Sequence, residues 1–440
     1  MPEASFHFPR GFLWGTATAA HQVEGFNSNN QWWEWEQTPG KIIHGDKSGA
    51  ACDWWNGKWR DDLDRAVENG QNTHRLSIEW SRVQPNIDEW DEDAVDRYIE
   101  ILRGLVERNL TPFVTLHHFS NPLWLSEFGA WENEESIHYF EEYVRRVVDV
   151  LKDYVTYWVT INEPNVYTFL SYLTGDFPPG KKDLFLGVKV LANLVRAHAA
   201  AYHAIHEIQP SARVGIAHQY RGAYPASSWS IFDRVGVGLM NDLFNESFPR
   251  SLTTGKFRTI LGSQRIPQAK DTQDFIGINY YTRDQIHLDL TKPGFIQRDF
   301  RPGVDLSDSG SIANEPEGLF EAINWARKFD KPILIMENGL DDSEDILRPR
   351  YLIEHIHQIW RAVNENYPVK GYFHWTLVDN FEWERGWSQR FGLWELDPET
   401  QTRTKRKSAN LYAEIIHENG ITADIVGRYT PEILDKIFPS

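Results

Sequence analysis

The stretches Thr160-Ile161-Asn162-Glu163-Pro164 and Ile335-Met336-Glu337-Asn338-Gly339 each end a short apolar, β-like run in a carboxylate. Proline and Asn-Gly commonly begin helices and turns, so each glutamate is expected where a strand passes into a loop. Two glutamates held at the ends of two strands can cleave a glycosidic bond, because one protonates the leaving oxygen while the other attacks or stabilises the anomeric carbon. A lone Asn-Glu-Pro would be explained equally well as a plain helix N-terminus. The second strand-end glutamate favours the catalytic interpretation.

Eight strand-like runs alternate along the chain with longer amphipathic stretches. The expected strands cover residues 11–17, 73–79, 112–118, 157–162, 213–217, 275–281, 332–337 and 371–377, and the expected helices include 93–108, 134–151, 188–208, 316–329 and 349–366. This α/β alternation predicts parallel strands, and eight units predict a closed (β/α)8 TIM barrel with its active site at the C-terminal ends of the strands. A doubly wound sheet is the rival fold. It is disfavoured because no Gly-x-Gly-x-x-Gly or Gly-x-x-x-x-Gly-Lys-Ser/Thr loop follows the first strand.

The domain organisation follows from what the chain lacks. Its 440 residues would allow two or three domains, but α/β barrels often exceed that length as one unit. No internal repeat, low-complexity tract or linker is found, so residues 1–440 are predicted to form a single catalytic barrel domain. Segments 290–314 and 379–397 are too long and irregular for simple turns and are expected to be functional loops at one face.

Composition excludes several classes of partner. The formal net charge of -18 argues against nucleic acid or an anionic membrane, which both require a basic face. No apolar run is expected to span a membrane, and the N-terminal residues lack the basic and apolar regions of a signal peptide. The single cysteine, Cys52, rules out an intrachain disulfide and fits a reducing compartment, so a cytoplasmic location is predicted. The 19 Trp and 17 Tyr permit sugar binding, although most are expected to be core residues.

Further motifs match one known family in order along the chain. They are Phe8-Pro9-Arg10-Gly11-Phe12-Leu13-Trp14-Gly15-Thr16-Ala17-Thr18 followed by Gln22 and Glu24-Gly25, then Arg75-Leu76-Ser77-Ile78-Glu79-Trp80-Ser81-Arg82, Asn279-Tyr280-Tyr281, and Trp375-Thr376-Leu377-Val378-Asp379-Asn380-Phe381-Glu382-Trp383. With the two opening stretches, they resemble the family 1 glycoside hydrolases, the β-glucosidase and β-galactosidase family, over essentially the whole chain.

The resemblance implies a retaining double-displacement mechanism with a covalent glycosyl-enzyme. Glu163 matches the family's acid/base and Glu337 its nucleophile. Arg75, Tyr281 and Asn279 match residues that support the nucleophile, and a structural ion pair is the alternative for Arg75. Positions that bind the hydroxyls of the non-reducing sugar are matched by Gln22, His118, Asn162, Glu382 and Trp383, and its stacking platform is matched by Trp375. Taken alone, His118 would be better explained as a core histidine.

The implied substrates are small β-glycosides or oligosaccharides with a terminal non-reducing β-D-glucosyl residue, or else a β-D-galactosyl or β-D-fucosyl residue. No metal or other cofactor is expected, and the oligomeric state is left open. Three positions depart from the usual family pattern: His21, the Phe119-Ser120 that follows His118, and Ile312, which stands where many members have a Trp. These departures leave the aglycone preference undecided.

Three alternatives are considered. A noncatalytic sugar-binding barrel would be expected to lack one of the two glutamates. A different barrel enzyme would need a strand-end lysine or a His-rich metal cluster, and neither stands out. A 6-phospho-β-glycosidase of the same family would carry a small hydroxyl residue where this chain has Glu382.

Overall fold

The fold is a closed barrel of eight parallel strands. The computed structural model describes residues 4–289, 291 and 296–439. The barrel order is β10-β13-β14-β2-β3-β4-β5-β6, and neighbouring strands pair in parallel. Their bounds are Leu13–Ala17 (β2), Thr73–Ser77 (β3), Thr111–His117 (β4), Tyr157–Asn162 (β5), Arg213–Gln219 (β6), Phe275–Asn279 (β10), Ile333–Asn338 (β13) and Val369–His374 (β14). The predicted (β/α)8 barrel is confirmed, and the doubly wound sheet is excluded.

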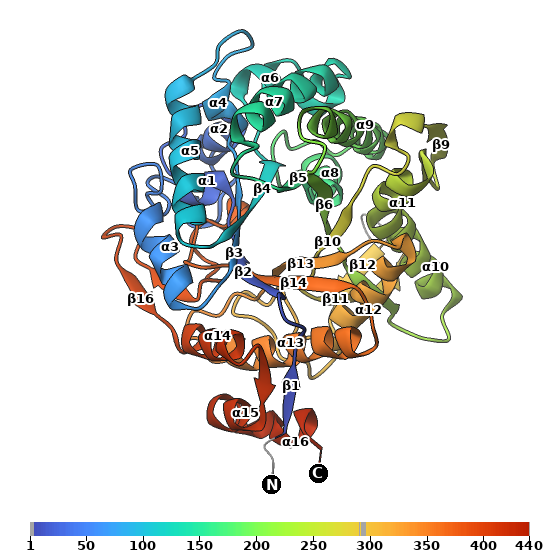
Figure 1. The fold of residues 1–440 in the computed structure, drawn as a ribbon. Helices are drawn as coiled ribbons and strands as arrows, with labels where there is room; N and C mark the ends of the chain where they lie inside the picture. Colours follow the sequence, from blue (N-terminus) through green and yellow to red (C-terminus); the bar gives the residue numbers. More distant parts are fainter. Residues whose placement is uncertain (1–3, 290, 292–295, 440) are drawn as a thin grey trace.

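Helices surround the barrel in a ring (Figure 1). The five predicted ones are observed as α5 (Glu92–Glu107), α7 (Glu135–Leu151), α9 (Leu184–Ile208), α12 (Pro316–Ala326) and α13 (Arg348–Asn364). Helix α9 begins four residues before its predicted start, because the Asp183 side chain accepts hydrogen bonds from the backbone of Phe185 and Leu186. This cap satisfies N–H groups that would otherwise lack a partner at the helix start.

The barrel interior is filled with side chains. Strands β3 and β10 are buried along their whole length, as expected for parallel strands covered on both faces. Inside the barrel, the Phe113 ring on β4 lies 4.2 Å from Tyr157 on β5 and 5.0 Å from Phe373 on β14. These aromatic residues pack the barrel at the level of the N-terminal half of β4 and β5.

Both segments predicted as irregular loops contain regular structure, so that part of the prediction was wrong. In segment 290–314, Leu290 and residues 292–295 lie outside the described residues, but Ile296–Asp299 forms strand β12. It pairs antiparallel with β11 (Arg283–Leu288), which in turn pairs with β7 (Gly222–Pro225). In segment 379–397, Trp394–Leu396 forms β15 and pairs with β16 (Arg403–Lys405). These short strands depend on partners that are distant in sequence.

The apolar character of α9 corrects a second expectation. Within the described part of the chain, α9 is the helix that is long and apolar enough to cross a membrane by length and composition. However, 61% of its most apolar window is buried inside the protein, and the helix packs beside α7. A core helix meets the same criterion, so this finding is weak evidence for a membrane span.

Candidate active site

Glu163 and Glu337 lie where two barrel strands end. Glu163 follows β5 directly and precedes α8 (Pro164–Thr168), with a left-handed backbone at φ 44° and ψ 58°. Such a conformation is uncommon for a non-glycine residue, and the backbone N–H of Glu163 is held by a 2.7 Å hydrogen bond to the carbonyl of Ala217 on β6. Glu337 is the penultimate residue of β13. Both side chains are almost fully buried.

The Glu337 carboxylate accepts two strong hydrogen bonds. Arg75 Nη1 donates to Oε1 at 2.6 Å, and the Tyr281 hydroxyl donates to Oε2 at 2.7 Å. Burial raises the pKa of Glu337 above its ordinary value, while the Arg75 charge and the Tyr281 hydroxyl act in the opposite direction. The two donors therefore favour the ionised form of a carboxyl group that burial would otherwise neutralise.

Arg75 lies in the middle of β3, not at a strand end as predicted. Its side chain is fully buried and reaches the catalytic end of the barrel because the guanidinium group stands on a long stem. Besides Glu337, it donates to Asn162 Oδ1 at 2.6 Å and to Thr115 Oγ1 at 3.0 Å. These three acceptors hold the guanidinium group in a single orientation.

Glu163 has different surroundings. Its only printed side-chain partner among the described residues is Asn279 at the end of β10, whose Nδ2 donates to Glu163 Oε1 at 2.8 Å. The same amide nitrogen lies 3.2 Å from Asn162 Oδ1. Burial and the charge of Glu337 raise the pKa of Glu163 well above its ordinary value. Of the two carboxyl groups, Glu163 is therefore the one expected to keep its proton while Glu337 is ionised.

The amide of Asn162 links this carboxylate pair to His118. Because Oδ1 of Asn162 accepts from Arg75, its Nδ2 faces His118 Nε2, at 3.0 Å, and must donate. Burial and the nearby Arg75 charge lower the pKa of His118 well below its ordinary value. His118 is therefore neutral, with its proton on Nδ1.

A second polar group forms around Glu382. Gln22 Nε2 donates to Glu382 Oε2 at 3.1 Å and to the carbonyl of Phe381 at 2.9 Å, and Asn380 Nδ2 donates to the same carboxylate oxygen at 3.2 Å. Burial raises the pKa of Glu382 to about 8, with further contributions from the carboxylates of Glu384 and Glu337. This carboxyl group can therefore carry a proton at neutral pH.

These groups share one cavity of about 210 Å³. Eight of the eleven predicted site residues line it: His118, Asn162, Glu163, Tyr281, Glu337, Trp375, Glu382 and Trp383. The other three, Gln22, Arg75 and Asn279, support the lining residues from behind through the hydrogen bonds given above. The structure therefore brings all eleven residues, from eight different parts of the sequence, to one place.

Trp375 and Trp383 form aromatic walls of this cavity. The Trp383 ring packs 4.8 Å from Trp32 and 6.0 Å from the His118 ring, nearly parallel to it, and Trp375 lies 6.2 Å from His118. Both indoles are more than nine-tenths buried, so their orientation is fixed by packing. Flat faces of this kind can stack on the C–H faces of a sugar ring.

Sequence reasoning missed much of the outer wall. In addition to Ile312, the cavity is lined by Phe119, Val166, Leu170, Phe177, Gln219, Arg221, Ser311, Glu384, Arg385, Gln389 and Phe391. Val166 and Leu170 follow Glu163 at i+3 and i+7, so helical spacing from the glutamate could have identified them. Ser311 and Gln389 carried no such signal, because two separate loops bring them together.

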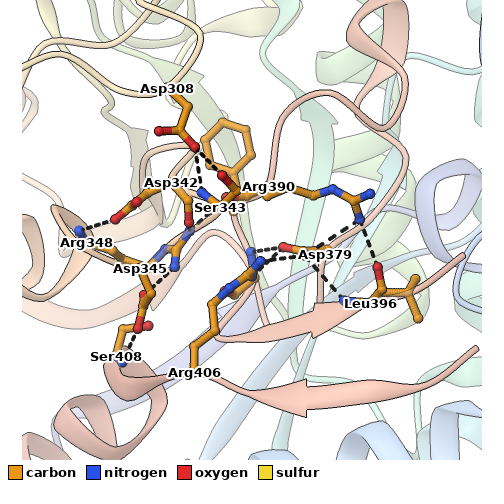
Figure 2. Close-up of polar contacts among 12 residues, drawn as sticks. Asp308, Asp342, Ser343, Asp345, Arg348, Asp379, Arg390, Leu396, Arg406 and Ser408 are labelled. Carbon is orange, nitrogen blue, oxygen red and sulfur yellow. Dashed lines mark hydrogen bonds and ion pairs between the residues drawn. The ribbon is translucent and has the colours of Figure 1, made fainter.

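A buried ion pair fixes the loop that carries Glu382 and Trp383 (Figure 2). The Asp379 carboxylate, at the start of this loop, accepts from both terminal nitrogens of Arg406 at 2.8 and 2.9 Å. It also accepts from the backbone of Gly392, at the other end of the loop, at 2.8 Å. A Cβ at Gly392 would lie 2.3 Å from the Asp379 backbone nitrogen, so only glycine permits this closure. Asp379 thus joins both ends of the loop.

No group of three or more His, Cys, Asp or Glu side chains that could hold a metal ion is found among the described residues. The site instead contains carboxyl groups, amides, a neutral imidazole and a guanidinium group, which together can bind hydroxyls and transfer a proton.

Comparison with known proteins identifies the family. The model described as "Glycosyl hydrolase family 1" matches residues 4–421. A 1,4-beta-D-glucan glucohydrolase from Thermotoga neapolitana is 32% identical, and the alignment covers 94% of this chain and 99% of that protein. A beta-galactosidase from Pyrococcus woesei is 29% identical, with 95% and 98% covered.

Solved structures agree. A beta-glycosidase from Pyrococcus horikoshii superposes with a TM-score of 0.90 at 36% identity, covering 97% of this chain and 98% of that chain. A beta-glucosidase from Thermotoga maritima, solved with glucoimidazole and also with a galacto-hydroximolactam, superposes with a TM-score of 0.89 at 30% identity, covering 94% of this chain and 100% of that one. The chain belongs to glycosyl hydrolase family 1 and is a β-glucosidase-like glycoside hydrolase.

Proposed function

We propose that the protein is a retaining β-glycosidase that removes terminal non-reducing β-D-glucosyl residues and also accepts β-D-galactosyl or β-D-fucosyl residues. The observation that carries this proposal is the unequal environment of two buried carboxyl groups at one cavity. Glu337 is bonded by Arg75 and Tyr281, whereas Glu163 is bonded only by the Asn279 amide among the contacts of the described chain. This difference suits an ionised nucleophile beside a protonated acid.

In the first step, Glu337 attacks the anomeric carbon and Glu163 protonates the departing oxygen. The C–O bond to the aglycone breaks as the ester bond to Glu337 forms. Ester formation removes the negative charge of Glu337, which was one cause of the raised pKa of Glu163. The pKa of Glu163 therefore falls as the intermediate forms.

In the second step, Glu163 acts as the base. It takes a proton from water, the water oxygen attacks the anomeric carbon, and Glu337 leaves as a carboxylate. The charge restored on Glu337 again raises the pKa of Glu163, so the enzyme returns to its starting protonation state. The same pair of groups serves both steps.

The remaining predicted residues form the proposed sugar cradle. Asn162, beside Glu163, is suited to the 2-hydroxyl, where hydrogen bonds strengthen at the transition state. Gln22, His118 and Glu382 offer donors and acceptors for the other hydroxyls, and Trp375 offers a stacking face. Relatives solved with gluco- and galacto-type ligands support a cradle that tolerates either epimer.

The first prediction concerns stereochemistry. Hydrolysis of a β-glucoside is expected to release the β-anomer first, because two displacements at the anomeric carbon restore its configuration, and the carboxyl groups should be roughly 5 Å apart. Proton NMR of the first-formed sugar, recorded before mutarotation, measures this. An α-anomer as first product would contradict the proposed role of Glu337 as a nucleophile.

The second prediction concerns phosphorylated substrates. We expect kcat/KM for a nitrophenyl β-glucoside to exceed that for its 6-phosphate by about 100-fold or more at pH 7, because a phosphate dianion would be buried unpaired near Glu382, Glu384 and Glu337. The ratio should rise further as the pH passes about 8, since Glu382 then ionises. Because both substrates use the same acid and base, their common pH dependence cancels in this ratio.

A matched variant tests the role of Glu382 in this selectivity. Glu382→Ser removes the carboxylate and should reduce the ratio, whereas Glu395→Ser, at an exposed position on β15, should leave it unchanged. Equal or better turnover of the 6-phosphate by the unmodified protein would overturn both the role of Glu382 and the proposed substrate class.

We further propose that residues 1–440 form one catalytic domain, located in the cytoplasm and working without metal or other cofactor. The support is that the barrel closes with strands from residue 13 to residue 374 and that the single cysteine is buried and free. Turnover of a chromogenic β-glucoside with and without chelator tests the last point. It also tests the alternative of a noncatalytic sugar-binding barrel, which would show no turnover under either condition.

A further inference from the structure

Helix α10 (Ile231–Met240) presents an apolar face to solvent. Trp229, just before the helix, is 91% exposed, and Ile231, Phe232 and Val235 are 67%, 64% and 48% exposed. Together with Gly238, these residues are called here the α10 patch. Exposed aromatic side chains contribute about 150–250 Å² each, so the patch reaches the size at which apolar surface usually marks an interaction site. In Figure 1, α10 lies at the outer edge of the helix ring.

The fold explains only the inner face of α10. The buried Asp233 accepts hydrogen bonds from the backbone of Leu288, on β11, and of Ser227, both at 3.1 Å. A Cβ at Gly236 would lie 3.1 Å from Ile286, so glycine there allows close packing on β11. These contacts fix the orientation of the helix and turn the α10 patch outward.

Gly238 is unexplained by packing within this chain. A Cβ there would meet no atom within 4 Å in the described structure, and the residue is exposed in the helix interior, where glycine costs about 1 kcal/mol relative to alanine. Glycine at the centre of an apolar helix face allows another backbone to approach closely. This position therefore indicates that a second helix crosses α10 here.

We propose that the α10 patch is a homodimer interface in which two copies of α10 pack antiparallel about a twofold axis near Gly238. Arg234 precedes this axis by four residues and Asp242 follows it by four, so Arg234 faces Asp242 of the partner subunit, and the reverse pair forms by symmetry. Asp242 already accepts from Arg250 through Oδ1 at 3.0 Å, and its second oxygen can accept from the partner. The helix face is thus self-complementary in charge.

Charge favours a second copy over a lipid surface. A helix that lies on a membrane usually carries Lys and Arg on its polar face. Here the opposite face is anchored to the protein through Asp233, and Asp242 lies at the far end of the patch on a chain with a net charge of -18. Between two copies, in contrast, the Arg234 and Asp242 charges compensate each other.

A charge-swap experiment on the full-length protein tests the interface. Sedimentation equilibrium should show a dimer for the unmodified protein. Arg234→Asp and Asp242→Arg should each raise the dimer dissociation constant by about tenfold or more, since each places like charges together. The double variant Arg234→Asp/Asp242→Arg should restore dimerisation to within about threefold of the unmodified protein. Ile346→Arg is the matched control, because Ile346 is 79% exposed outside the patch and its substitution should change nothing.

Three outcomes would overturn the proposal. They are a monomer at every concentration of the unmodified protein, a double variant no better than the single variants, and flotation of a monomer with zwitterionic phosphatidylcholine vesicles. The last would assign the patch to a lipid surface. Because the double variant regains what each single variant loses, misfolding of a single variant cannot imitate the expected pattern.

Discussion

Glu337→Gln is expected to lower kcat for a nitrophenyl β-glucoside by about 10,000-fold or more, the scale seen when a covalent nucleophile is removed. The amide that replaces the carboxylate cannot attack the anomeric carbon. It also leaves the buried Arg75 without its charged partner, which is 2.6 Å away in the unmodified protein. Initial rates measured with purified variant, together with a thermal melting curve to verify folding, give the result.

Two further variants separate chemistry from structure. Glu399→Gln changes an exposed glutamate in the same way and should keep full activity. Glu337→Gly leaves space at the anomeric face, so external azide should restore turnover and yield the α-glycosyl azide by a single inversion. If Glu337→Gln kept more than about a hundredth of the unmodified rate, or if azide produced the β-azide, the nucleophile would have to be another residue.

The barrel could be predicted because its strands carry their own signal. The runs that became β5 and β13 are apolar, short and followed by Pro164 or Asn338-Gly339, and these local features persist whatever the rest of the chain does. Strands β12 and β15 could not be predicted in this way. Each is three or four residues long and exists because a distant segment supplies its hydrogen-bond partner.

The catalytic end was predictable to a similar extent. Strand-end position identified Glu163 and Glu337, but Arg75 was misplaced because a strand pattern does not show how far a long side chain reaches. The outer wall was not predictable, since Gln389 meets Ser311 only where two loops converge, at 3.0 Å. The exposed patch was missed because an apolar helix is normally expected to turn that face inward.

Glu163→Ala is expected to reduce kcat/KM by about 1,000-fold for an alkyl β-glucoside, whose leaving group needs a proton, and far less for a dinitrophenyl β-glucoside, whose leaving group does not. Glu163 must be protonated in the first step, so activity is lost as the pH rises through its pKa. Burial and Glu337 place that pKa well above the ordinary value, and the alkaline limb lies correspondingly high. The acid limb follows the raised pKa of Glu337, which must be ionised.

In Glu163→Ala the alkaline limb for the dinitrophenyl substrate should therefore disappear, while the acid limb set by Glu337 remains. Glu163→Gln is the matched control for position, because its amide oxygen can still accept the 2.8 Å hydrogen bond from Asn279 but cannot transfer a proton. Both variants should show the same flat alkaline profile, measured as kcat/KM against pH. An alkaline limb that persists in either variant would mean that another group donates the proton, and that the raised pKa of Glu163 reflects burial alone.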